Sequence, residues 1–159
     1  MRKWLAIAAI IIVADQITKA LVTGHFVFGE SLPLTSFFNL VLAYNTGAAF
    51  SFLADAGGWQ RWFFALVAIL ASGTILFFLH KHRNEPRFCF ALSLILGGAL
   101  GNLIDRILLG HVIDFLDFHV VGYHWPAFNV ADSAITIGAL ILIWESFHGK
   151  SAQTAGKYR

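Results

Sequence analysis

Residues 88–108 read FCFALSLILGGALGNLIDRIL, and this stretch decides the fold of the chain. No Asp, Glu, Lys or Arg interrupts it before Asp105. A helix needs about 20 such residues to cross the roughly 30 Å hydrocarbon core of a bilayer. Three other stretches have similar character, at about 4–23, 62–79 and 127–144. Because the 159 residues are 58% hydrophobic and only 13% charged, we predict a membrane protein and not a soluble domain.

The predicted fold class is an all-α membrane protein with four transmembrane helices, in a single integral membrane domain covering residues 1–159. Two outer loops, at about 24–58 and 110–126, separate the helices. The first loop is too long for a simple turn, and its residues 37–44 have the composition of a strand. We therefore expect a small β-rich platform on the periplasmic surface. The polar residues 149–159 are predicted to form a flexible cytoplasmic tail.

Basic residues indicate how the four helices are oriented. Eight of the eleven Lys and Arg residues fall on one side of the predicted spans, and the two outer loops contain none. Cytoplasmic segments carry the excess of Lys and Arg, so both termini are predicted to be cytoplasmic. The net charge is only +2, and we interpret these basic clusters as topology signals and not as a nucleic-acid surface. The eight residues are Arg2, Lys3, Lys81, Arg83, Arg87, Lys150, Lys157 and Arg159.

The first span starts with basic residues, as a secretory signal peptide does. No A-x-A-like cleavage site follows, and Asp15, Gln16 and Lys19 interrupt the later part, so a retained helix is expected. The single cysteine, Cys89, cannot form an intramolecular disulfide and is predicted to be a small buried residue.

Polar residues within the spans share one depth. A helical rise of 1.5 Å per residue places Asp15 roughly 18 Å from Lys3 and Asn102 about 22 Å from Arg87. The same count places Lys19, Arg106, Asn129 and Asp132 in the outer half of the membrane. The spacing also aligns them: Asn129, Asp132, Ser133 and Thr136 form one stripe of a helix, as do Gly98, Asn102 and Asp105. We therefore expect a polar cluster between helices, open to water on the outer side.

Several of these residues allow a second interpretation. Asp15 and Lys19 are spaced i, i+4, which favours a structural or gating ion pair over a catalytic role. Arg106 either extends to the interface or holds a ligand carbonyl. Asp117 is expected to be a solvated carboxylate in the second loop. The asparagines Asn45, Asn102 and Asn129 could simply tie helices together.

Most catalytic chemistries lack their sequence signals here. The seven histidines show no H-E-x-x-H or comparable spacing, so no metal and no cofactor are expected. No G-x-S-x-G motif, Ser/Lys pair or nucleophilic Cys occurs at the polar depth, and no glycine-rich phosphate loop is present. Two aspartates in apolar surroundings remain, Asp114 and Asp132. If they meet, they can share one proton, one polarising a peptide carbonyl while the other activates water.

Five ordered motifs support this hypothesis, and any one of them alone would be a weak signal. They are Asp15-Gln16-x-x-Lys19, Asn45-Thr46-Gly47-Ala48-Ala49-Phe50-Ser51, Gly97-Gly98-Ala99-x-Gly101-Asn102-x-x-Asp105-Arg106, Val112-Ile113-Asp114-Phe115 and Phe128-Asn129-x-Ala131-Asp132. Together with four spans, they resemble the bacterial lipoprotein signal peptidase family, also called signal peptidase II.

The resemblance implies an aspartic endopeptidase of the bacterial inner membrane. Such an enzyme cleaves the signal peptide of diacylglyceryl-modified prolipoproteins just before the lipidated cysteine, without a cofactor, and globomycin is its expected inhibitor. Asp114 and Asp132 match the catalytic pair. The supporting positions matched are Asn45, Asn102, Asp105, Arg106, Asn129, Asp15 and Lys19.

Two other classes of function stay open from the residues alone. Intramembrane Asp, Lys and Arg also mark ion- or proton-coupled transporters. However, the polar residues stop halfway and leave no polar path through the cytoplasmic half of the spans. A purely structural assembly role would make Asp132 dispensable.

Overall fold

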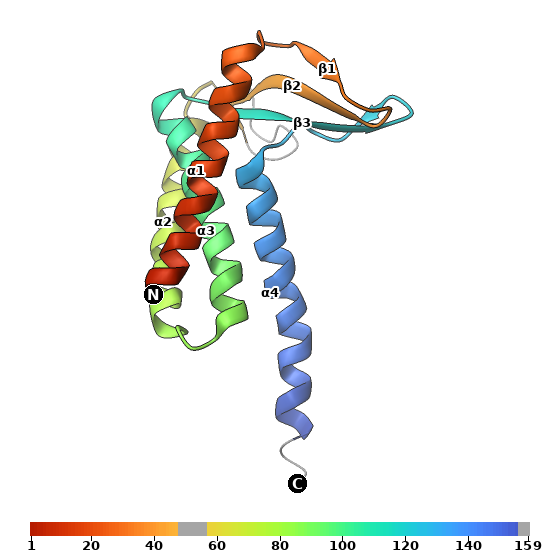
Figure 1. Cartoon of the computed structure of the whole chain (residues 1–159). Helices are drawn as coiled ribbons and strands as arrows, with labels where there is room; N and C mark the ends of the chain where they lie inside the picture. The colour runs from red at the N-terminus through yellow and green to blue at the C-terminus, as the bar shows by residue number, and fades with distance from the viewer. Residues whose placement is uncertain (48–56, 156–159) are drawn as a thin grey trace.

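The computed structural model describes residues 1–47 and 57–155, with side chains as far as residue 148. Four long helices stand side by side, and a sheet crosses one end of them (Figure 1). The helices are α1 (Arg2–His25), α2 (Gln60–Lys81), α3 (Pro86–Leu108) and α4 (Val130–Ala155). All four are long and apolar enough to span a membrane, which confirms the predicted fold class.

Helix α3 is the centre of the bundle. Of the most apolar 18 residues of α3, 67% are buried inside the protein, whereas the corresponding share is 17–22% in the other three helices. Those three instead expose large apolar side chains such as Ile10, Leu70 and Leu140, each at least 60% exposed. Water does not favour such surfaces, but lipid does. The bundle therefore packs around α3 and turns its outer faces to the membrane.

Glycines let α1 and α4 approach α3 closely. A Cβ at Gly97 would lie 2.7 Å from Cβ of Ile11 on α1. A Cβ at Gly98 would collide with the carbonyl oxygen of Ala131 on α4, and one at Gly101 would lie 2.7 Å from Oδ2 of Asp15. The Gly97–Gly101 spacing thus brings two helices within contact distance of a third, as small residues do in membrane bundles.

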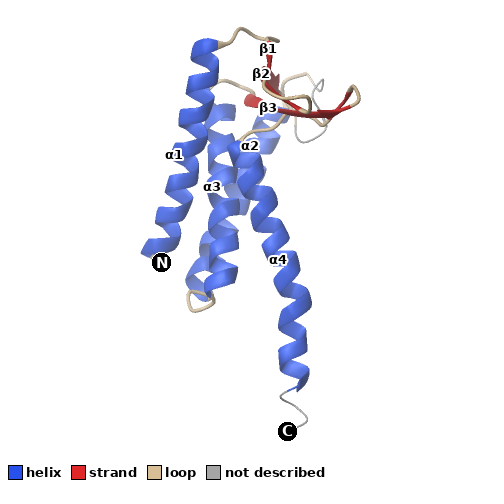
Figure 2. Cartoon of the chain, turned by 45° about the vertical axis from the view of Figure 1, so that its right-hand side comes forward, coloured by secondary structure: helices blue, strands red, loops and turns tan. Residues whose placement is uncertain are grey.

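The sheet has four antiparallel strands in the order β1-β2-β3-β4. Their bounds are β1 (Ser31–Pro33), β2 (Phe38–Asn45), β3 (Val112–Val120) and β4 (Tyr123–His124). The platform predicted from loop 24–58 therefore exists, but half of it comes from the second loop, which had no predicted strand. Figure 2 shows the sheet extending to one side of the helices.

Two apolar clusters hold this arrangement together. One lies among α1, α2 and α3, away from the sheet: Trp4, Ala8, Ile75, Leu79, Cys89, Leu92 and Leu96. The other joins the end of α1 to the sheet: Val22, Leu42, Ile113 and Phe115. Cys89 is fully buried in the first cluster, as the sequence predicted.

The N-terminus and the C-terminal part of α4 lie at the end of the bundle opposite the sheet (Figure 1). Helix α4 begins three residues later than the predicted span, at Val130, because Phe128 still pairs with Leu116 of β3. It continues to Ala155, so it takes in most of the segment predicted to be a flexible tail. Residues 156–159, and the part of the 45–51 turn beyond Gly47, lie outside the described residues.

Candidate active site

A cavity of about 670 Å³ opens where the sheet meets α3 and α4. Its polar wall comes from four elements that are far apart in the sequence. Asn45 ends β2, Asn102 and Arg106 lie on α3, and Asp114 lies on β3, while α4 contributes Asp132. The apolar wall is formed by Val112, Trp125, Pro126, Ala127, Phe128, Ile135 and Ile137. An acidic pair, Asp114 and Asp132, therefore faces one partly apolar space.

Asp114 is buried, with 3% of its surface exposed. Its Oδ1 accepts a hydrogen bond from Nδ2 of Asn129 at 2.7 Å, and its Oδ2 accepts one from Nδ2 of Asn45 at 3.1 Å. Burial and the neighbouring charge of Asp132 raise the pKa of Asp114 to about 7, although the two asparagine hydrogen bonds oppose this shift. Asp114 can therefore either hold or release a proton near neutral pH.

Asp132 lies in the first turn of α4. Its Oδ1 accepts a hydrogen bond from Nδ2 of Asn102 at 2.7 Å. Its backbone N–H donates to Oδ1 of Asn129 at 2.9 Å, so Asn129 caps the helix in the way that asparagine favours. The carboxylate is thus held at a helix N-terminus, where the aligned peptide dipoles favour negative charge.

Asn129 connects the two aspartates through a single side-chain amide. Its oxygen receives the N–H of Asp132 and its nitrogen donates to Asp114. A backbone N–H can only donate, so the amide oxygen must face Asp132 and the NH₂ group must face Asp114. Asn129 is fully buried, which leaves it no freedom to reorient.

The same reasoning fixes the other two asparagines. The Asn45 oxygen accepts from the backbone N–H of Gly47 at 3.0 Å, so its NH₂ group faces Asp114. The Asn102 oxygen accepts from Nζ of Lys19 at 2.9 Å, so its NH₂ group faces Asp132. Every amide around the acidic pair thus presents a donor to a carboxylate, because an obligate donor holds its other end.

Behind Asn102 lies a buried ion cluster. Nζ of Lys19 is 2.7 Å from Oδ2 of Asp15 and 2.7 Å from Oδ2 of Asp105, and all three side chains are at most 2% exposed. The other carboxylate oxygens are also satisfied: Asp15 accepts the N–H of Ala131 at 2.9 Å, and Asp105 accepts Nε2 of Gln16 at 2.8 Å. The cluster therefore ties α1 to α3 and to the start of α4, which supports the structural interpretation of the Asp15–Lys19 pair.

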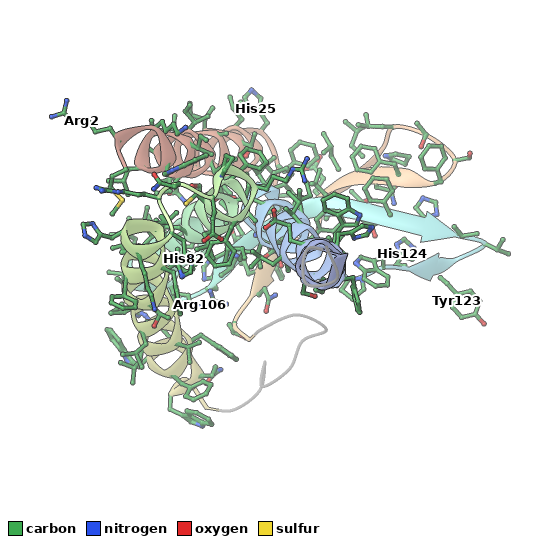
Figure 3. All side chains as sticks on the ribbon, turned by 90° about the horizontal axis from the view of Figure 1, so that it is seen from below. Arg2, His25, His82, Arg106, Tyr123 and His124 are labelled. Carbon is green, nitrogen blue, oxygen red and sulfur yellow. The ribbon has the colours of Figure 1, made fainter. Side chains whose placement is uncertain are left out.

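Arg106 lies at the rim of the cavity. Its Nη2 donates to the carbonyl of Gly47 at 2.9 Å, and its guanidinium carbon is 5.3 Å from the centre of the Phe64 ring. Figure 3, seen along the helices, places Arg106 on the side of α3 that faces α2. The side chain holds a carbonyl, although that carbonyl belongs to the protein's own β2–α2 connection.

The expectation for Asp117 is wrong. This residue is 6% exposed and not solvated, because Asn39 of β2 lies opposite it in the register and donates to it at 2.7 Å. Nδ1 of His124 lies 2.9 Å from both of its oxygens. Burial raises the pKa of Asp117, but the hydrogen bonds from His124 and Asn39, with the charges of His124 and His119, bring it below its ordinary value. The sequence missed this because β3 was not recognised as a strand.

The predicted polar residues separate into two layers. Asp114, Asp132, Asn45, Asn102 and Arg106 line the cavity with Ser133 and Thr136 of the predicted α4 stripe. A layer behind them holds Asn129, Asp15, Lys19 and Asp105. The apolar wall was not predicted, since nothing distinguishes its Trp125, Phe128 or Ile137 from ordinary apolar residues. Within the described part of the chain no cluster of His, Cys, Asp and Glu could hold a metal ion.

The fold and the cavity define a membrane-spanning protein with an acidic pair beside an apolar groove. A family model described as signal peptidase (SPase) II matches residues 7–148. The chain therefore belongs to the signal peptidase II family and is a peptidase.

Relatives agree along most of the chain. A lipoprotein signal peptidase of Cupriavidus necator is 61% identical over 140 residues, which cover 88% of this chain and 80% of the relative. One from Janthinobacterium sp. is 61% identical over 145 residues, covering 91% and 88%. A solved structure of a bacterial membrane enzyme superposes with a TM-score of 0.87 at 32% identity, covering 96% of this chain and 92% of that one. A second such structure gives 0.78 at 34% identity, covering 90% and 91%.

Proposed function

We propose that this lipoprotein signal peptidase is an aspartic endopeptidase in which Asp114 and Asp132 form the catalytic pair. The carrying observation is that both carboxyl groups face one cavity while buried amide donors hold them. Its substrates are diacylglyceryl-modified prolipoproteins, cut just before the lipidated cysteine. The apolar wall of the cavity, which includes Val112, Phe128 and Ile137, suits the signal peptide and the lipid chains.

The pair works with one shared proton. The ionised carboxylate takes a proton from a water molecule, and the resulting oxygen attacks the carbonyl carbon of the scissile peptide bond. The protonated carboxyl gives its proton to the carbonyl oxygen, which forms a neutral tetrahedral intermediate. Collapse of the intermediate breaks the C–N bond. The first carboxyl returns its proton to the leaving nitrogen, and a hydroxyl of the intermediate returns a proton to the second carboxylate as the new C=O bond forms. The raised pKa of Asp114 supports this, because a carboxyl that titrates near 7 is able to play either role.

The supporting residues act through the pair. The amides of Asn45 and Asn129 donate hydrogen bonds to Asp114, and the amide of Asn102 donates one to Asp132. Because these contacts need only acceptor oxygens, a proton on either aspartate can point toward the cavity. Lys19, Asp15 and Asp105 fix Asn102. Arg106 holds the carbonyl of Gly47 at the entrance, and so shapes the space into which substrate enters.

The protein is proposed to be a multi-pass component of the bacterial inner membrane with its cavity toward the periplasm. The sheet end of the molecule carries the cavity, and the opposite end carries the basic N-terminal residues and the basic α2–α3 connection. By the positive-inside rule this opposite end is cytoplasmic. Substrate then reaches the cavity from the outer leaflet of the bilayer.

The test uses purified protein in lipid and a diacylglyceryl-modified precursor. Asp114→Asn and Asp132→Asn are each expected to abolish cleavage. Asp117→Asn keeps most activity, because Asp117 lies on the same strand as Asp114 but does not line the cavity. Globomycin is expected to inhibit the unchanged protein. Full activity of either cavity variant would overturn the catalytic assignment, and equal loss in all three variants would attribute the effect to folding.

A further inference from the structure

The turn between β3 and β4 has a conformation that its residues do not favour. Val121 has φ +50° and Gly122 has φ +82°, so both central residues of this two-residue hairpin are left-handed. Asn-Gly is the usual sequence for such a turn, and a β-branched residue in this region is a genuine outlier. Val121 is also 91% exposed, so no protein contact offsets the strain. Folding alone gives no reason for valine at this position.

The residues around the turn are equally unsuited to water. Val120 is 69% exposed and Tyr123 is 85% exposed. No Asp, Glu, Lys or Arg occurs between Phe118 and Pro126. An edge strand that faces water is usually protected by charges, because an uncharged apolar edge promotes aggregation. This hairpin has no such protection.

The position of the turn indicates what covers it. The sheet crosses the ends of the helices, and β3 continues past α4 away from the bundle (Figures 1 and 2). Viewed along the helices, Tyr123 lies at the far end of this extension and points outward (Figure 3). The ends of membrane-spanning helices mark the boundary between hydrocarbon and headgroups. The turn therefore stands beside the protein at the depth of the lipid headgroups.

We propose that the β3–β4 turn, residues 120–123, is an interfacial anchor whose partner is the lipid surface next to the sheet. Val120 and Val121 enter the boundary of the acyl chains, and Tyr123 lies among the headgroups, where tyrosine is enriched. The occupant is lipid and not protein because the turn stands level with the ends of four helices that are long and apolar enough to span a membrane. The anchor does not depend on the proposed catalytic chemistry.

The anchor has a consequence for the cavity. Trp125 lies two residues after the turn, and its N–H donates to the carbonyl of Phe118 at 2.7 Å, while Phe128 pairs with Leu116. Residues 125–128, which form one wall of the cavity, are thus hydrogen-bonded to the strand that leads to the turn. Lipid contact at the turn therefore keeps this wall at the membrane surface.

Cys89 is the only cysteine, so a Cys89→Ala background allows one fluorescent label at a chosen position. We would place an environment-sensitive label at Val121→Cys in lipid nanodiscs and compare quenching by aqueous iodide and by lipids brominated near the headgroup. Asn84→Cys, in the exposed α2–α3 connection, is the water control, and Val67→Cys, on the exposed face of α2, is the lipid control.

The label at position 121 is expected to resist iodide and to be quenched by the brominated lipid. Iodide quenching equal to that at position 84 would overturn the proposal. Shielding from both quenchers would also overturn it, since that result indicates a second copy or another protein as the occupant.

A second measurement separates anchoring from folding. With the label at Tyr123→Cys, Val121→Asn relieves the backbone strain and removes the apolar side chain, whereas Val121→Ile keeps the apolar, β-branched character. Lipid quenching is expected to fall at least roughly twofold in the Asn variant and to stay unchanged in the Ile variant. Equal lipid quenching in the protein with Val121 and in its Asn and Ile variants would show that the Val121 side chain does not anchor the turn in lipid.

Discussion

Three asparagines determine how the acidic pair is hydrogen-bonded. Asn45, Asn102 and Asn129 each hold their oxygen against an obligate donor and so direct an NH₂ group at a carboxylate. A protonated Asp114 can still accept both of its amide contacts, because its O–H is free to point into the cavity. An asparagine at position 114 cannot, since its own NH₂ group would meet another donor. The surroundings therefore suit a carboxyl group in either protonation state and no amide.

The raised pKa of Asp114 predicts a pH-dependent stability. Its folded pKa of about 7 lies above the ordinary 3.8, so the folded state binds the proton more tightly. The stabilisation is present below pH 4 and is lost as pH rises through 7, by about 4 kcal/mol at most. We expect the unfolding temperature to fall between pH 5 and pH 8, and Asp114→Asn to flatten this slope.

Thermal unfolding in detergent at several pH values measures the effect. Asp117→Asn is the matched control. The pKa of Asp117 lies below its ordinary value, so this carboxyl group does not titrate between pH 5 and pH 8. A slope that is unchanged in Asp114→Asn would contradict the assigned burial of the carboxyl charge.

Asn129 is predicted to be a positioning residue. Asn129→Ala removes the cap of α4 and the 2.7 Å contact with Asp114, and should cost about 1–2 kcal/mol of stability. Misplacing the pair should lower kcat about 100-fold with a smaller change in KM.

Asn129→Asp separates positioning from stability. It keeps the cap but sets a third carboxyl group against Asp114, whose pKa should rise further because like charges disfavour ionisation. The basic limb of the pH–rate profile is then expected to move to higher pH. If Asn129→Asp lost as much activity as Asn129→Ala while its pH–rate profile did not move, the role of Asn129 would be structural only.

At the scale of elements, the contact of α3 with α4 sets the position of Asp132. Gly98 allows it, since a Cβ there would collide with the carbonyl of Ala131, next to Asp132, and would lie 2.7 Å from Cγ1 of Ile135. Gly73 on α2 offers a matched comparison, because a Cβ there meets nothing within 4 Å. The two glycines therefore differ in packing while both lie within helices.

Gly98→Ala is expected to destabilise the protein by about 1–3 kcal/mol and to lower cleavage, because α4 must move away from α3. Gly73→Ala should instead leave activity unchanged and raise stability by about 0.5–1 kcal/mol, because alanine favours the helix. Thermal unfolding and precursor cleavage measure both variants. Equal behaviour of the two would mean that the α3–α4 contact does not position the pair.

At the scale of the whole molecule, the N-terminus and the C-terminal part of α4 lie at the end opposite the sheet. Reporter proteins fused to the C-terminus test the predicted orientation. A fluorescent protein that folds only in the cytoplasm should be bright there, and a phosphatase that is active only in the periplasm should be inactive. The reverse pattern would place the cavity on the cytoplasmic side and contradict the proposed localisation.

The sequence by itself determined the number and the approximate limits of the spanning helices. Length, apolarity and the cost of charge in lipid are local properties, and they can be read without knowing what packs against what. The same cost made Asp15, Lys19, Asn102, Arg106 and Asp132 conspicuous and placed them at one depth. The ordered motifs then indicated the family, which the comparisons confirm.

Only the tertiary structure decided how those residues meet. Strand β3 escaped prediction because its pairing partner, β2, lies about 70 residues away and because both of its faces carry apolar residues, which hides the alternation of a strand. Its existence explains why Asp117 is buried and why Asn129 can touch Asp114. Hydrogen bonds across such distances depend on the packed positions of whole elements, and no local pattern in the chain encodes them.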